Sequence, residues 1–253
     1  MSSINIIPIG SGSTGNSIYF EIGPYHLLID MGIGSKKVKA ALSINNRNIE
    51  DIDAIFLTHG HYDHTKACKA IANATNCNVY ANESSMYPIR DINANRIIIE
   101  EGQTEIFQDL FVTMFHVPHD YSFTSGYTFT YKNTKLAYVT DCGKMYDSIF
   151  NELLDSDVVI IESNHDIEML KHGPYPKELQ NRILSKYGHL SNIDCANTIN
   201  ELYKHGTKNF LLAHISLKNN TSELALNTTK TLLNTEDIYL YACPEEGNDL
   251  LEF

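Results

Sequence analysis

The chain lacks the features that mark membrane, secreted and disulfide-stapled proteins. No apolar run in its 253 residues approaches the roughly 18 residues that a membrane span needs. The five cysteines are odd in number and no two have CxxC spacing, so neither a disulfide framework nor a zinc ribbon is indicated. The first ten residues contain no basic segment and no long apolar segment, so no signal peptide is predicted. We therefore expect a reduced, soluble, cytoplasmic protein.

Basic residues are scarce relative to acidic ones. Lys and Arg total 19 against 31 Asp and Glu, which gives a net charge of -12 with histidine neutral. So acidic a chain disfavours proteins that coat duplex nucleic acid or anionic membranes with a basic face. The remaining composition, with 43% hydrophobic and 20% charged residues, is that of an ordinary globular protein.

Short apolar segments alternate with helical segments through both halves of the chain. Strands are expected over 4–9, 17–21, 26–30, 52–58, 79–80, 96–100, 107–115, 126–131, 135–140, 158–161, 209–213 and 238–241. Helices are expected over 35–45, from the histidine cluster to 74, and over 145–154, 176–187, 191–205 and 221–233. This order predicts a layered α/β fold. No Pro- or Ser-rich linker interrupts it, so residues 1–253 are predicted to form one domain with two halves.

The densest chemical signal is a cluster of imidazoles and carboxylates at the end of the strand over 52–58. Four potential metal ligands occur within six residues, namely His59, His61, Asp63 and His64. In extended backbone His59 and His61 point the same way, and a following helix would turn the other two toward a second position. Imidazole with carboxylate suits zinc, manganese or iron. Such a set can hold two metals that activate a bridging water.

Two metals need further ligands, and candidates stand at the ends of apolar strands. His119, Asp141 and His214 each lie at or just beyond such an end, where layered sheets place their sites. Asp141 is suited to bridge two cations because it has two carboxylate oxygens. His116 competes with His119, and spacing alone does not choose between them.

The HxHxDH string at 59–64, followed in order by His119, Asp141 and His214, resembles the metallo-β-lactamase superfamily. A more selective run from 162 to 192 resembles the WalJ (YycJ-like) group, which is related to ribonuclease Z-like phosphodiesterases. That run contains the strings ESNHDIEML at 162–170, GPYP at 173–176, RILS at 182–185 and GHLSN at 188–192. The loop over 11–17 and the segments at 213–216 and 219–220 share the resemblance, which therefore spans nearly the whole chain.

The resemblance implies a fold and a ligand set. The fold is an αββα sandwich in which two mixed β-sheets are flanked by helices, with the site at the edge. One divalent ion, zinc or manganese, is assigned to His59, His61 and His119, a second to Asp63, His64 and His214, and Asp141 bridges them. His119 is preferred to His116 because a short loop to Gly126-Tyr127 follows the motif histidine. Cys142 departs from the family pattern and is expected to be a small buried residue rather than a soft metal ligand.

Phosphodiester cleavage also requires a proton for the leaving alkoxide. His189 is the candidate acid and Glu162 its orienting partner, a pairing that resembles the Glu and His of ribonuclease Z-like enzymes. A histidine held by a carboxylate is poised near neutral pH. The alternative is that His189 caps the helix expected from 191. Asp63 completes the set of residues predicted to take part in catalysis.

Several neighbouring residues have weaker assignments. Asp30 ends the strand over 26–30, and the superfamily pattern implies that it orients ligands from behind. His165 lies either at the edge of the substrate or at a helix start. In the loop over 11–17, Ser13, Thr14 and Asn16 either offer donors to a phosphate or form a glycine-rich turn.

The leading expectation is a metal-dependent phosphodiesterase in which a hydroxide activated by two metals attacks the phosphodiester. The resemblance implies a DNA exonuclease acting at strand ends, and the alternative is hydrolysis of small cyclic nucleotides. A thioester or amide hydrolase is disfavoured by the missing secretion signal and by the pair Glu162 and His189. Two cations add about +4 to the charge of -12 and leave about -8, so phosphate is expected to bind only at the site. No membrane partner is expected, and a homo-oligomer is plausible because many relatives assemble.

Overall fold

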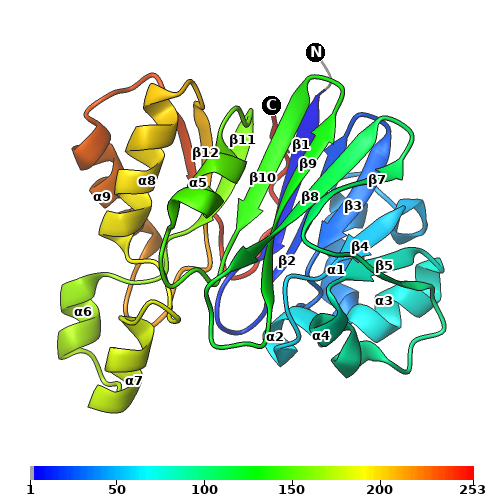
Figure 1. Cartoon of the computed structure of the whole chain (residues 1–253), viewed down its shortest axis with the longest axis horizontal. Helices are drawn as coiled ribbons and strands as arrows, with labels where there is room; N and C mark the ends of the chain where they lie inside the picture. The colour runs from blue at the N-terminus through cyan, green and yellow to red at the C-terminus, as the bar shows by residue number, and fades with distance from the viewer. Residues whose placement is uncertain (1–2) are drawn as a thin grey trace.

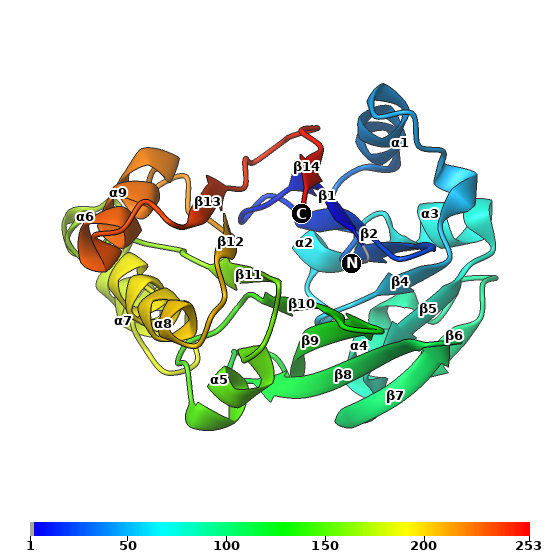
Figure 2. The same cartoon turned by 90° about the horizontal axis from the view of Figure 1, so that it is seen from above.

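Residues 3–253 form two facing sheets of seven strands each in this computed structural model. The first sheet has the strand order β14-β1-β2-β3-β4-β5-β6, and the second has the order β13-β12-β11-β10-β9-β8-β7. Figure 2 shows the sheets in the middle of the molecule, with α1 and α3 outside the first sheet and α5, α8 and α9 outside the second. Both sheets contain parallel and antiparallel pairs. The expected αββα sandwich is confirmed.

The elements follow one another along the chain in two similar halves. The strands of the first sheet are β1 (Ile4–Gly10), β2 (Ser17–Ile22), β3 (Tyr25–Ile29), β4 (Ala54–Phe56), β5 (Asn78–Ala81), β6 (Arg96–Ile98) and β14 (Leu251–Glu252). Those of the second are β7 (Gly102–Phe107), β8 (Leu110–Val117), β9 (Thr124–Tyr131), β10 (Thr134–Val139), β11 (Val158–Glu162), β12 (Asn209–Ala213) and β13 (Tyr239–Ala242). The α-helices are α1 (Ser35–Ile44), α2 (Tyr62–Thr65), α3 (Cys68–Thr75), α4 (Glu83–Met86), α5 (Asp147–Leu153), α6 (Ile167–His172), α7 (Lys177–Ile183), α8 (Asn192–Lys204) and α9 (Ser222–Leu233), and two 3-10 turns cover Ile49–Asp51 and Tyr87–Ile89.

Three apolar clusters join these layers. Alternate residues of a strand enter different clusters because successive side chains point to opposite faces of a sheet. In β11, Val158 and Ile160 pack between the two sheets, whereas Val159 and Ile161 pack under the outer helices. The third cluster lies between the first sheet and the helices α1 and α3. The strands that carry the site are thus buried on both faces, which holds their ends rigidly.

Three predicted elements differ from the structure. The strand expected over 107–115 starts too early, because Asp109 adopts a left-handed conformation (φ 63°) that reverses the chain between Phe107, the end of β7, and Leu110, the start of β8. The rest of β7 was not expected from the sequence. The helix expected up to 74 is broken, since the N–H of Ala67 donates to the carbonyl of Met31 (2.7 Å) between α2 and α3. The helix expected over 176–187 ends at Ile183, whose carbonyl accepts from the N–H of His189 (3.0 Å). The loop that carries His189 is consequently free of helix.

Both halves place the carboxyl ends of parallel strands at one edge of the molecule. β3 to β6 run parallel to one another, and so do β10 to β13. The helices α2, α4 and α7, which follow or adjoin these strand ends, lie along the lower edge of Figure 1. In open α/β sheets this edge carries the ligand site.

Three sequence-based expectations concern features beyond this architecture. Within residues 3–253, no helix combines the length and the apolar character that crossing a membrane requires. The single-domain interpretation stays a prediction. The prediction that no leader is present rests partly on residues 1–2, which lie outside the described part of the chain.

Candidate metal centre

The first sheet supplies the HxHxDH cluster from the loop after β4 and from α2. His59 is fully buried, and its Nε2 lies 2.8 Å from Nδ1 of His61, so both imidazoles face the same point as predicted. The short helix α2 turns Asp63 and His64 toward the same centre, where Asp63 Oδ2 lies 3.5 Å from His64 Nε2. A Cβ on Gly60 would collide with the hydroxyl of Tyr121, so a larger residue there would displace this ring.

The second sheet supplies His119, Asp141 and His214 from the ends of β8, β10 and β12. His119 Nε2 and His214 Nδ1 each lie 3.6 Å from Asp141 Oδ1. His116 is exposed and packs its ring edge-on against Phe123. The structure therefore brings His119 into the cluster and leaves His116 outside it.

The potential ligand atoms form overlapping groups within 4.8 Å of one another. One group contains His59, His61 and His119, and a second contains Asp63, His64 and His214. Asp141 joins both sides, because it also groups with His59 and His64 and again with His214. These groupings coincide with the two ligand sets that the family resemblance implied.

Two of these atoms are buried without a hydrogen-bond partner among the described residues. They are Oδ2 of Asp141 and Nε2 of His214. A buried polar atom with no partner costs about 1–3 kcal/mol, and nitrogen with carboxylate oxygen is the donor set that divalent metals such as zinc and manganese accept. The residues present therefore fit a divalent metal at this centre.

Asp30 and Thr58 hold His64 from behind. Asp30 Oδ2 lies 2.8 Å from His64 Nδ1, and Oδ1 accepts a hydrogen bond from the backbone N–H of Thr58 (2.9 Å). The Thr58 hydroxyl donates to the same carboxylate. Carboxylates in this position fix the ring orientation of a metal-binding histidine. Asp30 thus lies behind His64, and its role in orienting a metal ligand stays a prediction.

Glu162, at the end of β11, contacts two histidines and two backbone N–H groups on the second-sheet side of the site. Its Oε1 lies 2.9 Å from His189 Nδ1 and 2.7 Å from His214 Nδ1. Its Oε2 accepts from the backbone N–H groups of Cys142 (2.9 Å) and Leu190 (2.8 Å). Complete burial opposes the ionised form, but the two imidazoles outweigh it and lower the pKa of Glu162 to about 2. The sequence-predicted pairing of Glu162 with His189 is present in the structure.

The alternative role of His189, capping the helix after 191, is taken by another residue. Ser191 is the N-cap of α8, and its hydroxyl accepts from the backbone N–H of Asp194 (3.1 Å). The His189 side chain is 17% exposed and also lies 3.6 Å from Oδ1 of Asp141. It thus stands between the buried cluster and solvent.

Three site residues have strained backbones. Asp30, Asp141 and His214 have φ values of 56°, 54° and 52°, the left-handed region that L-residues rarely adopt. Each follows the end of a parallel strand. Such conformations cost of order 1–3 kcal/mol and persist where the surrounding structure over-determines them, commonly at functional sites.

Charge coupling shifts the titration of the buried cluster. Burial lowers the pKa of His59 well below its usual value. Burial has the same tendency at His214, but Asp141 and Glu162 overcome it and raise the pKa of His214 to about 9. Burial opposes ionisation of Asp141, yet the imidazoles of His214, His64 and His119 hold its pKa well below the usual range. The site therefore favours bound positive charge.

Some contributing residues were not singled out from the sequence. The Ser11 hydroxyl accepts from the backbone N–H of His214 (2.7 Å), and the Asn164 amide donates to the His214 carbonyl (2.9 Å). The ring of Tyr121 lies against His59 and His61, with centroids 5.5 and 5.0 Å away. Ser11 lies in a loop already marked as small and polar, but no local pattern indicates Tyr121.

The weaker assignments are resolved as follows. Cys142 is fully buried and burial raises the pKa of its thiol, as expected for a small buried residue. His165 is 1% exposed, so it lies inside the protein just before α6, and burial lowers its pKa to about 4. The Asn16 amide closes its own loop on Gly12 and lies 3.1 Å from His64 Nε2. Thr14 donates to Glu245.

Comparison with known proteins identifies the family of this chain. Residues 25–215 match the family described as the Beta-lactamase superfamily domain. The chain belongs to the beta-lactamase superfamily. It is therefore a hydrolase of the metallo-β-lactamase type, and its 36% identity over 230 residues to exodeoxyribonuclease YycJ from Bacillus anthracis, covering 89% of this chain and 87% of the relative, confirms the resemblance to the WalJ (YycJ-like) group.

Solved structures of this superfamily share the whole fold. The metallo-beta-lactamase fold protein YhfI from Bacillus subtilis has a TM-score of 0.76 at 17% identity, with both chains covered completely. The short form of human tRNase Z has a TM-score of 0.68 at 14% identity and covers 98% of each chain. At these identities the likeness concerns the fold alone.

Proposed function

We propose that this beta-lactamase superfamily member is a metal-dependent phosphodiesterase, and specifically a DNA exonuclease that acts at strand ends. The observation that carries the proposal is the contact of His189 with the buried carboxylate of Glu162 at the margin of a complete ligand set. The 36% identity to an exodeoxyribonuclease over most of both chains supports DNA as the substrate.

Two divalent ions, zinc or manganese, would be held by the residues of the two ligand groups, with Asp141 between them. When bound, such ions supply a hydroxide nucleophile at neutral pH and neutralise charge on the phosphoryl oxygens. The chain's own part is to fix the ligands. Asp30 orients His64, and Glu162 orients His214.

His189 provides the proton for the leaving oxygen. In the imidazolium form, Nδ1–H donates to Glu162 Oε1, and the second proton, on Nε2, is the one that the leaving oxygen takes. A histidine in this arrangement contributes about 100- to 10,000-fold as a general acid. Asp63, which is partly exposed, would help to hold the attacking water while it serves as a ligand.

Hydrolysis of simple esters tests the chemistry. Purified protein with Mn²⁺ or Zn²⁺ is expected to cleave bis-p-nitrophenyl phosphate, and His61→Ala or Asp141→Ala is expected to abolish cleavage. His116→Ala is the matched control, because this exposed histidine lies outside the cluster. A wild-type protein that leaves the phosphate ester intact but cleaves a thioester would contradict the phosphodiesterase proposal.

The identity of the substrate is tested by comparing the cleavage of DNA with that of cyclic nucleotides. Single-stranded oligonucleotides labelled at either end are compared with a panel of cyclic mononucleotides, and stepwise release from one DNA end is expected. Cleavage confined to the cyclic panel would refute the exonuclease and establish the alternative. Self-association of the chain stays a prediction, which sedimentation of the metal-loaded protein checks.

The role of His189 is tested by changing the leaving group. p-Nitrophenolate departs without a proton, whereas the alkoxide of DNA needs one. His189→Ala is therefore expected to lower kcat on DNA by about 100-fold or more while affecting bis-p-nitrophenyl phosphate far less. Equal losses on both substrates would assign His189 to ligand positioning instead.

A further inference from the structure

Exposed tyrosines paired with cations lie in chain segments that adjoin the residues of the metal centre. Within residues 3–253, five tyrosines have a Lys or Arg over the ring. Four of these tyrosines are also exposed, and we call them, with their cations, the tyrosine rim. The rim consists of Tyr62 with Lys66, Tyr87 with Arg90, Tyr146 with Lys144, and Tyr187 with Lys186.

Each rim tyrosine belongs to a segment that builds the site. Tyr62 directly follows His61, and Tyr187 lies two residues before His189. Tyr87 precedes Pro88, whose Cγ lies 2.8 Å from the place that a Cβ on Gly60 would occupy. The helices α2, α4 and α7 that neighbour these residues share the lower edge of Figure 1.

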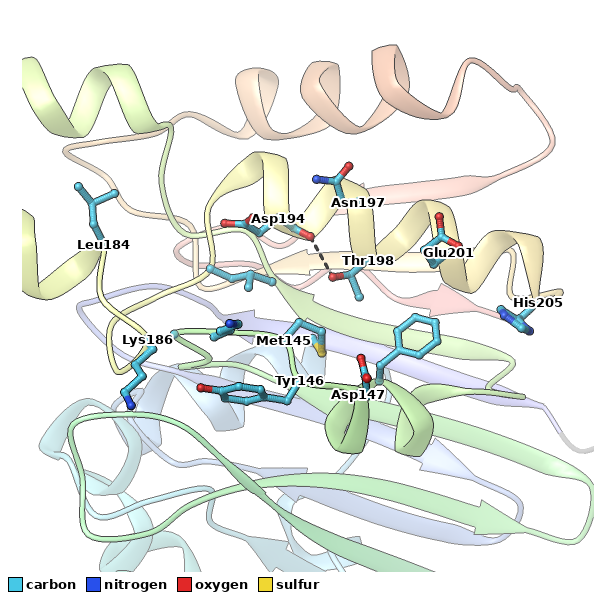
Figure 3. A pocket seen from close by; sticks show the side chains of 14 residues that line it. Met145, Tyr146, Asp147, Leu184, Lys186, Asp194, Asn197, Thr198, Glu201 and His205 are labelled. Carbon is cyan, nitrogen blue, oxygen red and sulfur yellow. Dashed lines mark hydrogen bonds between the residues drawn. The ribbon is translucent and has the colours of Figure 1, made fainter.

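Tyr146 and Lys186 line one cavity of about 590 Å³, which begins beside Gly143 and Leu190. In the chain, Gly143 lies two residues after Asp141, and Leu190 directly follows His189. Figure 3 shows Tyr146 and Lys186 at one end of this cavity and His205 at the other. One end of the cavity therefore lies beside the chain segments that carry Asp141 and His189.

The fifth tyrosine–cation pair, Tyr131 with Lys132, differs from the four rim pairs in its position and its burial. Tyr131 and Lys132 lie at the turn between β9 and β10. Asp141 follows the carboxyl end of β10, so this turn is at the opposite end of the strand. The Tyr131 ring there is partly buried and packs edge-on against Tyr25. It has an internal packing role that the exposed rim tyrosines lack.

The exposed tyrosine rings leave apolar surface in contact with water, and a bound ligand would cover this surface. The exposed fractions of Tyr62, Tyr87, Tyr146 and Tyr187 are 73%, 70%, 39% and 49%. Clustered exposed aromatic groups mark interaction sites. The chain has a net charge of -12, so the cations beside these rings are local exceptions on an acidic protein. The cations favour an anionic partner, and the rings favour a partner with flat apolar groups. Unpaired nucleic acid has this chemistry, because its bases are free to stack on aromatic side chains and its phosphates attract the cations.

We propose that the tyrosine rim binds the unpaired end of a DNA strand, with bases stacked on the tyrosines and phosphates beside their cations. This inference rests on the proposed nuclease function and narrows its substrate to ends with free base faces. In an intact duplex those faces are covered by neighbouring base pairs. The rim would act without sequence preference, because every base has a face that can stack.

The test compares alanine and phenylalanine variants on two substrates. For Tyr87, Tyr146 and Tyr187, changing tyrosine to alanine is expected to lower the ratio of kcat/KM on single-stranded DNA to kcat/KM on bis-p-nitrophenyl phosphate by roughly tenfold per residue. Tyrosine to phenylalanine retains the ring and is expected to keep the ratio. Tyr239→Ala is the matched control, since this tyrosine is 42% exposed and lies at the amino end of β13, away from the site.

A second measurement uses the substrate rather than the protein. Abasic residues at the DNA end are expected to lower kcat/KM of the wild type below that of each single alanine variant on normal DNA, and to remove the difference between wild type and variants. An unchanged ratio in all three alanine variants would overturn the inference, and so would a wild-type preference for blunt duplex. An altered oligomeric mass with an unchanged ratio would instead make the rim a contact between copies. Failure of the wild type on both substrates would refute the proposed function itself.

Discussion

Replacing Glu162 by glutamine removes one charge from a carboxylate that four donors surround. The two oxygens serve different partners: Oε1 faces Nδ1 of His189 and His214, and Oε2 accepts from the backbone N–H groups of Cys142 and Leu190. Glutamine offers only one acceptor oxygen. Its NH₂ group must therefore face either two backbone donors or the two imidazoles.

Both orientations have a calculable cost. With the NH₂ group toward the backbone, two buried N–H groups lose their acceptor, at about 1–3 kcal/mol each. With the NH₂ group toward the imidazoles, both rings must be neutral with no proton on Nδ1. His214 then presents N–H where a ligand nitrogen is needed, and His189 becomes an uncharged imidazole, which is a much weaker acid than the imidazolium. We expect stability to fall by about 2–6 kcal/mol in the first case, and kcat on DNA to fall by about 100-fold or more in either case.

Thermal unfolding and kinetics on folded protein measure these effects separately. Glu162→Asp keeps the charge and is the conservative comparison. Because the carboxylate acts through His189, the double variant of Glu162→Gln with His189→Ala is expected to be little slower on DNA than the worse single variant. Strict multiplication of the two losses, or DNA cleavage by Glu162→Gln within twofold of wild type, would refute the reasoning.

Two further predictions concern the support of the site and the acid stability of the fold. Asp30→Asn is expected to weaken metal binding about 10- to 100-fold through loss of its contact with His64, measured by chelator competition, with exposed Asp109→Asn as the unaffected control. Burial raises the pKa of Glu21, but hydrogen bonds led by that from Arg47 outweigh it and lower the pKa to about 2, so the pair stabilises the fold above pH 4.5 and loses this contribution as pH falls toward 2. Arg47→Gln is expected to cost about 1–2 kcal/mol at pH 7, with a gap to wild type that closes near pH 2 in urea titrations. A gap that does not depend on pH would show that Arg47 acts by packing alone.

Local sequence was a good guide to the first-sheet half of the site. The residues from His59 to His64 are consecutive, and a strand end followed by a helical turn has one short-range geometry. Their approach to a common centre therefore followed from spacing. The same reasoning recovered most helices and strands, but it started β8 at Phe107 and missed the rest of β7, because the left-handed turn residue between them, Asp109, has no glycine signal.

Long-range contacts were beyond such reasoning. His214 meets Glu162 across 52 residues because β11 and β12 are parallel and in register, with Glu162 opposite Ala213. His116 is directed outward by the alternation of β8, whereas the following loop carries His119 inward. Spacing alone did not choose between these two histidines, and the resemblance to the WalJ group had to supply the preference.

The amino-acid sequence by itself determined the family, the layered α/β character and the identity of the metal-binding residue types, because these depend on composition, short spacings and periodicity. Tertiary structure decided which carboxylate holds which imidazole and which of two histidines enters the cluster. These outcomes depend on strand register and on the edge where parallel strands end. Both arise from packing between residues far apart in the chain, which no local pattern records.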